Sequence, residues 1–237
     1  MTSIQRILLS AVFLFSAASG AESQNSPPGS APAQTAVHVI THIEVTAASI
    51  PRAIGLLRQY RDELAQSGNS SVDLYQELGR PYRFAINEQW QDRSTFEAQG
   101  TGAAMARLLA AVKELQTAPP DSHVFQGFAV GPVRPPGPGR AKLLATSYFE
   151  IPAPRLAEFD ALARPYVEAS RADEGGMRFD VLQELNPREN HVAVFEIWSS
   201  PQDFEAHRTS THVRRFREGL APMLSGAYDD RLYGKFD

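Results

Sequence analysis

The sequence predicts an α+β protein in which two tandem copies of one β-α-β-β-α-β unit pack together as an internal dimer. Two repeated blocks carry this prediction. Residues 68–78 and 175–185 each begin with glycine and contain an aspartate followed by Gln-Glu-Leu. Residues 88–98 and 196–206 each contain Glu-x-Trp and then Phe-Glu-Ala at the same spacing. Each copy has the size of a small domain, so the repeat indicates duplicated modules rather than a solenoid.

Composition limits the class of protein. The 237 residues are 43% hydrophobic and 21% charged, which is ordinary for a globular protein. A formal net charge of −4 shows no basic excess, so a nucleic acid is not an expected partner. The chain contains no cysteine, which excludes disulfides, thiolate catalysis, a lipid-modified N-terminal cysteine and cysteine-ligated metals.

The first 21 residues are expected to be a signal peptide. Arg6 supplies a positive charge, residues 7–18 form an apolar run, and residues 18–21 are the small residues typical of a cleavage site. The run is short for a membrane span, so we expect no stable membrane insertion after cleavage; the alternative is an uncleaved anchor. Residues 22–36 are rich in Ser, Pro, Gly, Ala and Gln and predict a flexible linker. We expect an exported protein, either periplasmic or secreted.

The first module is expected over residues 37–130. Alternating apolar residues predict its strands, and apolar residues at helical spacing predict its helices. The expected elements are a strand at 37–45, a helix at 49–67, strands at 72–78 and 82–90, a helix at 92–115 and a strand at 124–130. A linker at 131–140 follows, because four prolines and three glycines there prevent a regular helix or strand.

The second module is expected over residues 141–237 and repeats the order. In its first helix, Leu156, Phe159, Leu162 and Tyr166 recur at helical spacing. Ser200 is placed as the N-cap of its second helix, which is expected to run on toward residue 224. The expected elements are a strand at 142–151, a helix at 152–170, a hairpin of 177–185 and 191–198, the helix that Ser200 begins and a strand at 228–236.

This order of elements is the split βαβ, or ferredoxin-like, unit. Its helices cover only one face of its sheet, so the other face needs a partner, and a second sheet of the same kind supplies one. Two copies in one chain therefore predict an intramolecular dimeric α+β barrel. Whether this internal dimer forms a further homo-oligomer is left open by the sequence.

The second module resembles the antibiotic biosynthesis monooxygenase domain of the dimeric α+β barrel superfamily. The resemblance covers nearly all of residues 144–236. The residues that carry it are Arg178–Gln183, Phe195–Trp198, Phe204–His207, His212 with Phe216, and Leu220–Gly226. The first module has Gln99 and Ala104 at the places of His207 and His212, so it is similar to a diverged member of the family.

The resemblance implies a cofactor-independent monooxygenase that acts on a small aromatic or quinol-type substrate with dioxygen, in the pocket of the second module. Such chemistry needs a base that deprotonates a phenol and an apolar cavity that confines the reactive intermediate. Similar domains also handle haem or have no assigned reaction, and fold alone does not choose among these roles. The alternatives are an exported, non-catalytic small-molecule-binding protein and a haem-handling protein.

His207 and His212 are the candidate catalytic residues, because imidazole titrates near neutral pH. A structural alternative is that His207 bonds a backbone carbonyl and that His212 caps a break at residues 209–211. We expect no metal site, because two histidines five residues apart do not share one face of an ideal helix.

Aromatic and polar residues near the strand ends are candidates for substrate binding. The predicted substrate-binding residues are Trp198, Glu196, Phe204, Tyr148, Phe216 and Arg178. The alternative for the tryptophan is a place in the core. Some family members have a polar amide four residues before this tryptophan, where the chain has Val194.

Other charged residues of the second module are expected to be structural. Asp180 and its counterpart Asp73 are interpreted as solvated sheet residues or as salt-bridge partners of Arg178. Residues 214–217 predict a solvated helix face, although an arginine there could hold a substrate oxyanion.

Overall fold

The computed structural model describes residues 36–66, 70–99, 102–131, 143–185, 188–226 and 228–236. The expected signal peptide lies outside these residues. So do the two expected linkers, apart from Ala36 and Gly131.

The first module begins with strand β1 and ends with strand β4. Its elements are β1 (Val37–Glu44), a 3-10 turn (Ala47–Ser49), α1 (Ile50–Ala65), β2 (Ser70–Glu77), β3 (Arg83–Trp90), α2 (Arg93–Gln99), α3 (Ala103–Val112) and β4 (Asp121–Ala129). The second module repeats this order. Its elements are β5 (Leu143–Glu150), a 3-10 turn (Ala153–Arg155), α4 (Leu156–Ala172), β6 (Gly176–Glu184), β7 (His191–Trp198), α5 (Pro201–Arg208), α6 (Thr211–Leu220), a 3-10 turn (Ala221–Met223) and β8 (Asp229–Phe236).

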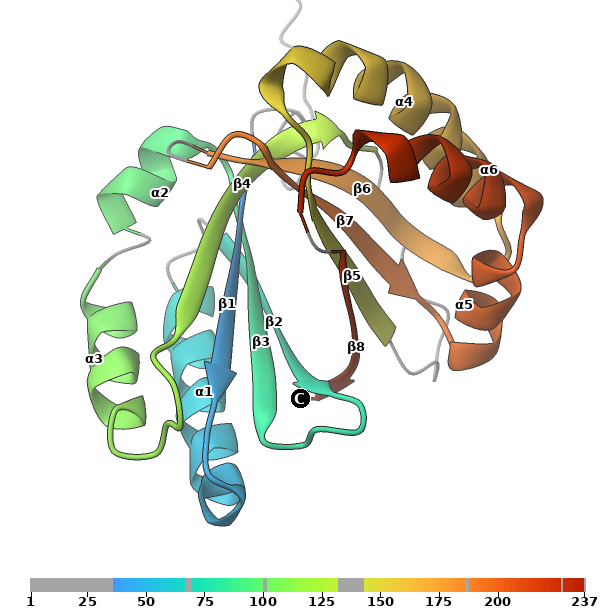
Figure 1. The fold of residues 1–237 in the computed structure, drawn as a ribbon. Coiled ribbons are helices and arrows are strands. Elements are labelled where there is room, and N and C mark those ends of the chain that lie inside the picture. Colours follow the sequence, from blue (N-terminus) through green and yellow to red (C-terminus); the bar gives the residue numbers. More distant parts are fainter. Residues whose placement is uncertain are drawn as a thin grey trace, which may run out of the picture. The chain divides into compact units, whose positions relative to one another are not determined.

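The eight strands form one closed barrel in the order β1-β3-β2-β8-β5-β7-β6-β4. All pairs are antiparallel, and two of them join the modules: β2 pairs with β8, and β4 pairs with β6. Figure 1 shows the helices of each module on the outside of its own strands. The prediction of two ferredoxin-like modules in an internal dimeric barrel is therefore confirmed.

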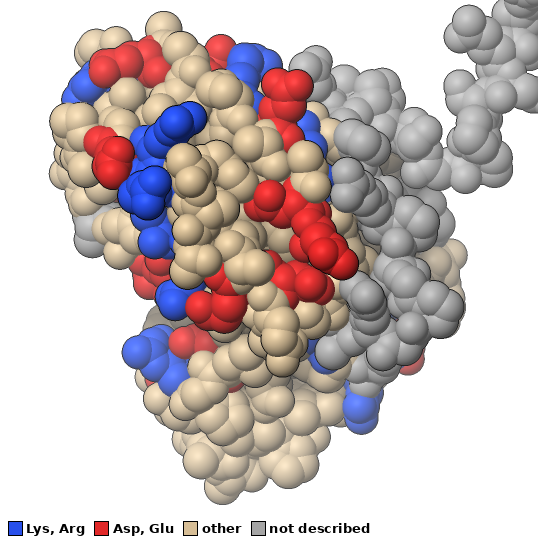
Figure 2. Space-filling model, turned by 90° about the vertical axis from the view of Figure 1, so that its right-hand side faces the viewer, with Lys and Arg blue, Asp and Glu red and all other residues tan. Residues whose placement is uncertain are grey.

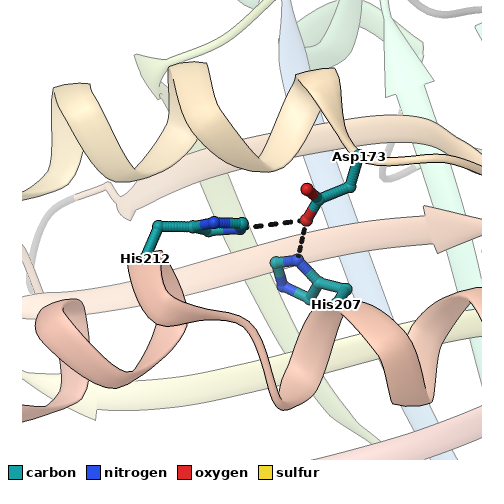
Figure 3. Close-up of side chains that lie close together, drawn as sticks. All are labelled: Asp173, His207 and His212. Atoms are coloured by element: carbon teal, nitrogen blue, oxygen red, sulfur yellow. Dashed lines mark hydrogen bonds and ion pairs between the residues drawn. The ribbon is translucent and has the colours of Figure 1, made fainter.

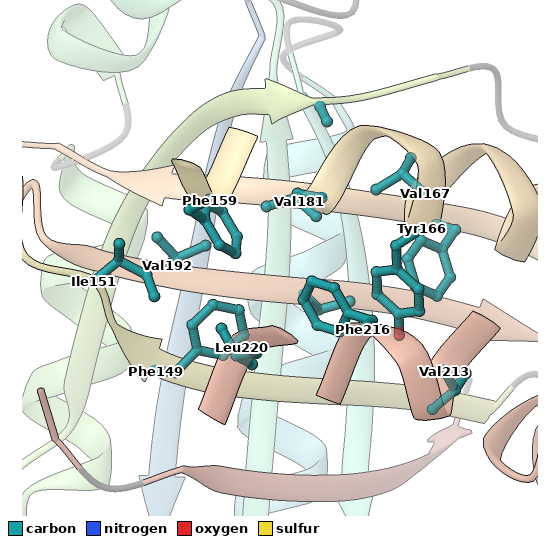
Figure 4. Packing of buried hydrophobic residues seen from close by; sticks show 14 of the residues in the cluster. Phe149, Ile151, Phe159, Tyr166, Val167, Val181, Val192, Val213, Phe216 and Leu220 are labelled. Carbon is teal, nitrogen blue, oxygen red and sulfur yellow. The ribbon is translucent and has the colours of Figure 1, made fainter. Parts of the chain in front are cut away.

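Alternation along the strands separates two environments, because successive side chains point to opposite faces of a sheet. The outward residues of β5, β6 and β7 pack under α4 and α6, as Figure 4 shows for the second module. Phe159 of α4 is fully buried there and lies against the rings of Phe149 and Phe216. Truncating such a buried ring to alanine typically costs about 3–5 kcal/mol of stability.

The inward face of the barrel carries a buried polar network. Arg178 donates from Nε to Asp180 at 2.5 Å, from Nη1 to Gln89 at 3.1 Å and from Nη2 to Nδ1 of His38 at 3.0 Å. His38 and Asp180 each expose only 1% of their surface. The interpretation of Asp180 as a solvated residue is wrong, and the alternative of a salt-bridge partner for Arg178 is confirmed.

The second helix of each module is broken, which differs from the single helices predicted at 92–115 and from Ser200 onward. In the second module, Ser200 accepts from the backbone N–H of Asp203, so the predicted N-cap of α5 is confirmed. Ser210 then caps a new helix by accepting from the N–H of Val213. A hydroxyl at this position stabilises a helix start because it satisfies a free N–H group.

No helix in the described part of the chain is both long and apolar enough to cross a membrane.

Candidate functional site

A cavity of about 150 Å³ lies in the second module between the outward face of its strands and the helices that cover them. Strands β5, β7 and β8 contribute its floor and one wall, and α4, α5 and α6 contribute the others. Its lining residues are Ala145, Thr146, Ser147, Tyr166, Glu196, Phe204, Glu205, His207, Arg208, Val213, Arg217, Tyr228, Asp230, Arg231 and Leu232.

The break between α5 and α6 brings two histidines together. His207 lies in the last turn of α5 and His212 in the first turn of α6, and their ring centroids are 5.4 Å apart. On one straight helix these residues would point in different directions. The break at Ser210 therefore creates the pair.

Asp173, the C-cap residue of α4, holds both imidazoles (Figure 3). Its Oδ2 lies 2.7 Å from Nδ1 of His207 and 2.9 Å from Nε2 of His212. An ionised carboxylate only accepts hydrogen bonds, so both of these ring nitrogens are donors. Neutral His207 therefore carries its proton on Nδ1, and its Nε2 has a free lone pair.

Nε2 of His207 faces Glu196 of β7, at 3.5 Å from Oε2. Burial raises the pKa of Glu196 to about 8, against the opposing effect of a 2.9 Å hydrogen bond from the indole of Trp198. Burial also lowers the pKa of His207, although Asp173 opposes this shift. At neutral pH the floor of the cavity therefore holds an uncharged imidazole beside a protonated carboxyl group.

The same cluster has the composition of a metal site. The ligand atoms of Asp173, His207 and His212 lie within 4.8 Å of one another. The two histidines lie on different helices, so the expectation that their side chains point in different directions is wrong. The two short N···O distances are, however, those of hydrogen bonds, with a proton between each pair of atoms. We therefore describe the cluster as hydrogen-bonded.

Three of the eight predicted site residues line the cavity: Glu196, Phe204 and His207. Three others do not line the cavity but lie next to residues that form it. Trp198 lies 4.6 Å from the His207 ring between centroids, His212 pairs with Asp173, and Phe216 stacks on Tyr166 at 3.9 Å.

Tyr148 and Arg178 lie elsewhere, on the inward face of the barrel. The hydroxyl of Tyr148 lies 3.1 Å from Nε2 of His42, a residue of the first module. Strand alternation explains both placements, because the neighbours Ser147 and Phe179 point outward to the cavity and to the helices. The alternation of side chains along paired strands, starting from Glu196 and Trp198, predicts the inward placement of Tyr148 and Arg178.

In the first module, the glutamate equivalent to Glu196 is fully hydrogen-bonded. This residue, Glu88, accepts from the Tyr60 hydroxyl at 2.7 Å and from the Trp90 indole at 2.8 Å, so both carboxylate oxygens are occupied. Tyr166 has the place of Tyr60 in the matching pattern of buried residues, but it stacks on Phe216 instead. Only in the second module does the buried glutamate face a cavity with a histidine beside it.

Sequence reasoning did not identify Asp173 as a site residue, and it named an arginine among residues 214–217 only as an alternative to a solvated helix face. Asp173 is 34 residues from His207 and lies at a helix end, where an aspartate is common without any function. The available signal was the repeat itself, since both histidines of the cluster occur only in the second copy.

Comparison with known proteins gives a family and a fold. The family model described as antibiotic biosynthesis monooxygenase matches residues 36–111 and 143–219. No curated protein sequence matches the chain.

Solved structures share the complete two-module fold. A candidate monooxygenase from Fusobacterium nucleatum superposes with a TM-score of 0.73 at 12% identity, covering 86% of this chain and 93% of that one. A candidate monooxygenase from Lactobacillus acidophilus has a TM-score of 0.68 at 9% identity, covering 85% and 94%. An anthrone oxidase-like protein also has a TM-score of 0.68, at 15% identity, covering 88% and 94%.

Proposed function

Because the chain belongs to the antibiotic biosynthesis monooxygenase family, we propose that the cavity of its second module oxygenates a small phenol or hydroquinone with dioxygen and no cofactor. One observation carries this proposal. A neutral His207, oriented by Asp173, presents an unprotonated Nε2 at the floor of a cavity that is lined by both apolar and charged side chains.

His207 is the base in this proposal. Its Nδ1–H is fixed by Asp173, so Nε2 is free to take the hydroxyl proton of the substrate, as in other Asp–His pairs. His212 holds Asp173 from the other side, which keeps the carboxylate in place. In this arrangement Asp173 and His212 are positioning residues.

The substrate itself supplies the electrons. The phenolate passes electrons to dioxygen, one oxygen atom is inserted at a ring carbon, and the other leaves as water. The hydroxyl hydrogen and the ring hydrogen of the substrate end in that water, so a phenol and O₂ give a quinone and H₂O. No organic cofactor is needed for this balance, and exclusion of bulk water protects the intermediates.

Oxygen consumption with a panel of small hydroquinones tests the proposal. His207→Asn is expected to lower kcat/KM by about 10²-fold to 10⁴-fold, the usual contribution of a general base. Asp173→Asn is expected to lower it by at least about tenfold, because the amide lets the imidazole adopt the wrong tautomer. His191→Asn, which changes a histidine at the start of β7 and outside the cavity, is the control.

Wild-type rates in the His207→Asn variant, with the fold intact by circular dichroism, would contradict the proposed base. Binding of hydroquinones without any oxygen consumption would favour the second candidate, a non-catalytic binding protein. That candidate is supported by Val194, which packs in the helix-covered core where some family members carry an amide. Haem gains no support from the geometry, since the cavity volume is that of a single aromatic ring.

We also propose that the protein is exported, on the pattern of residues 1–21. Mass spectrometry of the protein recovered from the cell envelope is expected to show a mature chain that begins near Glu22. Recovery of an uncleaved chain from the cytoplasm would contradict export.

A further inference from the structure

The size of the cavity limits the substrate to one aromatic ring. Its volume is about 150 Å³. An engineered protein cavity of about this volume holds benzene, which sets the scale. A polycyclic phenol exceeds this volume and would extend past the rim of the cavity. The volume therefore favours a monocyclic substrate.

The lining determines how such a ring would lie. Phe204, Val213 and Leu232 offer apolar contacts to its faces and edges. Glu196 and His207 form a polar floor, where a phenolic hydroxyl finds both a donor and an acceptor. The edge of the ring remote from this hydroxyl, including its meta positions, then points toward the rim.

The rim carries one arginine for which the described residues offer no carboxylate partner. Of the three arginines that line the cavity, Arg208 pairs with Glu205 at 3.0 Å and Arg231 with Asp229 at 2.7 Å. Arg217 makes no ion pair with any residue that the structure describes. Its charge acts on the cavity, because it lowers the pKa of Glu196 and of Tyr228, although burial and the nearby Asp230 carboxylate both raise these pKa values.

Arg217 has no basic counterpart at the equivalent position of the first module. Arg217 follows the buried Phe216 on α6, as Leu109 follows the buried Leu108 on α3 of the first module. Figure 2 shows a band of basic side chains on the face of the molecule that is at the right of Figure 1, where α5 and α6 lie. The same face also carries acidic side chains (Figure 2), so Arg217 itself, and not the overall charge of the face, is the group available to an anionic ligand.

From the volume and the unpaired arginine together, we infer that the substrate is a monocyclic phenol or hydroquinone that carries a carboxylate. The hydroxyl lies at His207 and Glu196, and the carboxylate binds the Arg217 guanidinium, which offers a planar pair of donors. This inference rests on the proposed function and narrows its substrate class. The reaction remains balanced, since one oxygen atom enters the ring and water carries away the two substrate hydrogens.

Three compounds separate the two parts of the inference: 2,5-dihydroxybenzoate, its uncharged carboxamide, and the bicyclic 1,4-dihydroxy-2-naphthoate. Calorimetric titration without oxygen gives Kd, and an oxygen electrode gives kcat/KM. Wild-type protein is expected to bind the benzoate at least about tenfold more tightly than either other compound. Arg217→Gln is expected to remove the preference over the carboxamide while carboxamide binding stays unchanged. Arg215→Gln, on the same helix but outside the cavity, is the matched control and should behave as wild type.

Each outcome has one reading. Equal affinity for the benzoate and the carboxamide, or a preference that survives Arg217→Gln, overturns the inference about charge. Naphthoate binding as tight as benzoate binding overturns the limit on size, and absence of binding by any monocyclic compound overturns the whole inference. Tight, Arg217-dependent benzoate binding without oxygen consumption sustains the inference and sinks the proposed function instead. Rapid oxygenation of the carboxamide would instead support the proposed function and overturn the inference about charge.

Discussion

Burial of His38 in the barrel interior leads to a quantitative prediction about stability at acid pH. His38 accepts a hydrogen bond from the Arg178 guanidinium at 3.0 Å and is 1% exposed. Burial, with the positive charge of Arg178 second, lowers the pKa of His38 from 6.5 to about 3. Between these two values the unfolded chain binds a proton on this residue and the folded chain does not. Stability is therefore lost as the pH falls from about 6.5 toward 3.

The size of this loss follows from the linkage relation. The slope of unfolding free energy with pH is 2.303RT per proton bound in excess by the unfolded state. Integrated from pH 7 to pH 5 for an unfolded pKa of about 6.5, one histidine contributes a loss of about 2 kcal/mol. The result depends little on the folded value, provided that His38 stays unprotonated at pH 5.

Urea unfolding of wild type and His38→Asn at pH 7, 6 and 5 measures this contribution. The asparagine oxygen takes the place of Nδ1 as acceptor, but it does not titrate. The stability advantage of wild type over the variant is expected to shrink by about 2 kcal/mol between pH 7 and pH 5. The comparison cancels other titrating groups, including Glu88 and Glu196, whose raised pKa values act in the opposite direction.

Gln89→Ala is the control, because it removes another partner of Arg178 without removing a titrating group. Its stability difference from wild type is expected to be the same at pH 5 and pH 7. The reasoning is refuted if the difference for His38→Asn also stays constant within about 0.5 kcal/mol, since the histidine would then protonate in the folded state.

Three further predictions test the site and the fold. With a substrate found, kcat/KM is expected to fall above about pH 8, where Glu196 ionises beside the bound phenolate, and Glu196→Gln should remove this fall; a fall that persists in the variant would assign it to another group. Tyr60→Phe is expected to cost about 1.5–3 kcal/mol in urea unfolding, because a buried carboxylate loses a hydrogen bond, and to leave oxygen consumption unchanged. Gly175→Ala should destabilise more than Gly79→Ala: both have positive φ (74° and 81°), but a Cβ at Gly175 would overlap the Asp203 side chain, whereas one at Gly79 would meet nothing within 4 Å. Equal losses would show that the side chain moves aside freely.

The fold could be predicted from sequence because the repeat supplied each element twice. Strand β7 was predicted with its observed bounds, and the other strands lie within a few residues of the prediction. The breaks in the second helices were missed, because the apolar spacing continues across residues 209–210 and only the Ser210 cap marks the new start. Local hydrogen bonding at this point outweighs the helical periodicity.

Parts of the site could be predicted from strand alternation and from the imidazole chemistry that singled out His207. Glu196 and Trp198 share the outward face of β7 and were correctly placed on the same side, as the hydrogen bond between them shows. Asp173 could not be found in this way. It reaches the histidines through the packing of α4 against α6, a tertiary contact for which no local pattern exists.

The divergence of the two modules follows from the demands of a buried carboxyl group. Each module keeps a glutamate two residues before a tryptophan on its third strand, and each glutamate accepts from that indole. Burial penalises the charged form in both places, so the group needs either further donors or a proton. In the first module Tyr60 supplies a second donor, and Glu88 becomes a structural residue. In the second module the corresponding tyrosine turns to Phe216, and Glu196 is left to hold a proton beside His207. The change of tyrosine partner, together with the histidine beside Glu196, therefore distinguishes the buried carboxyl group of the second module from that of the first.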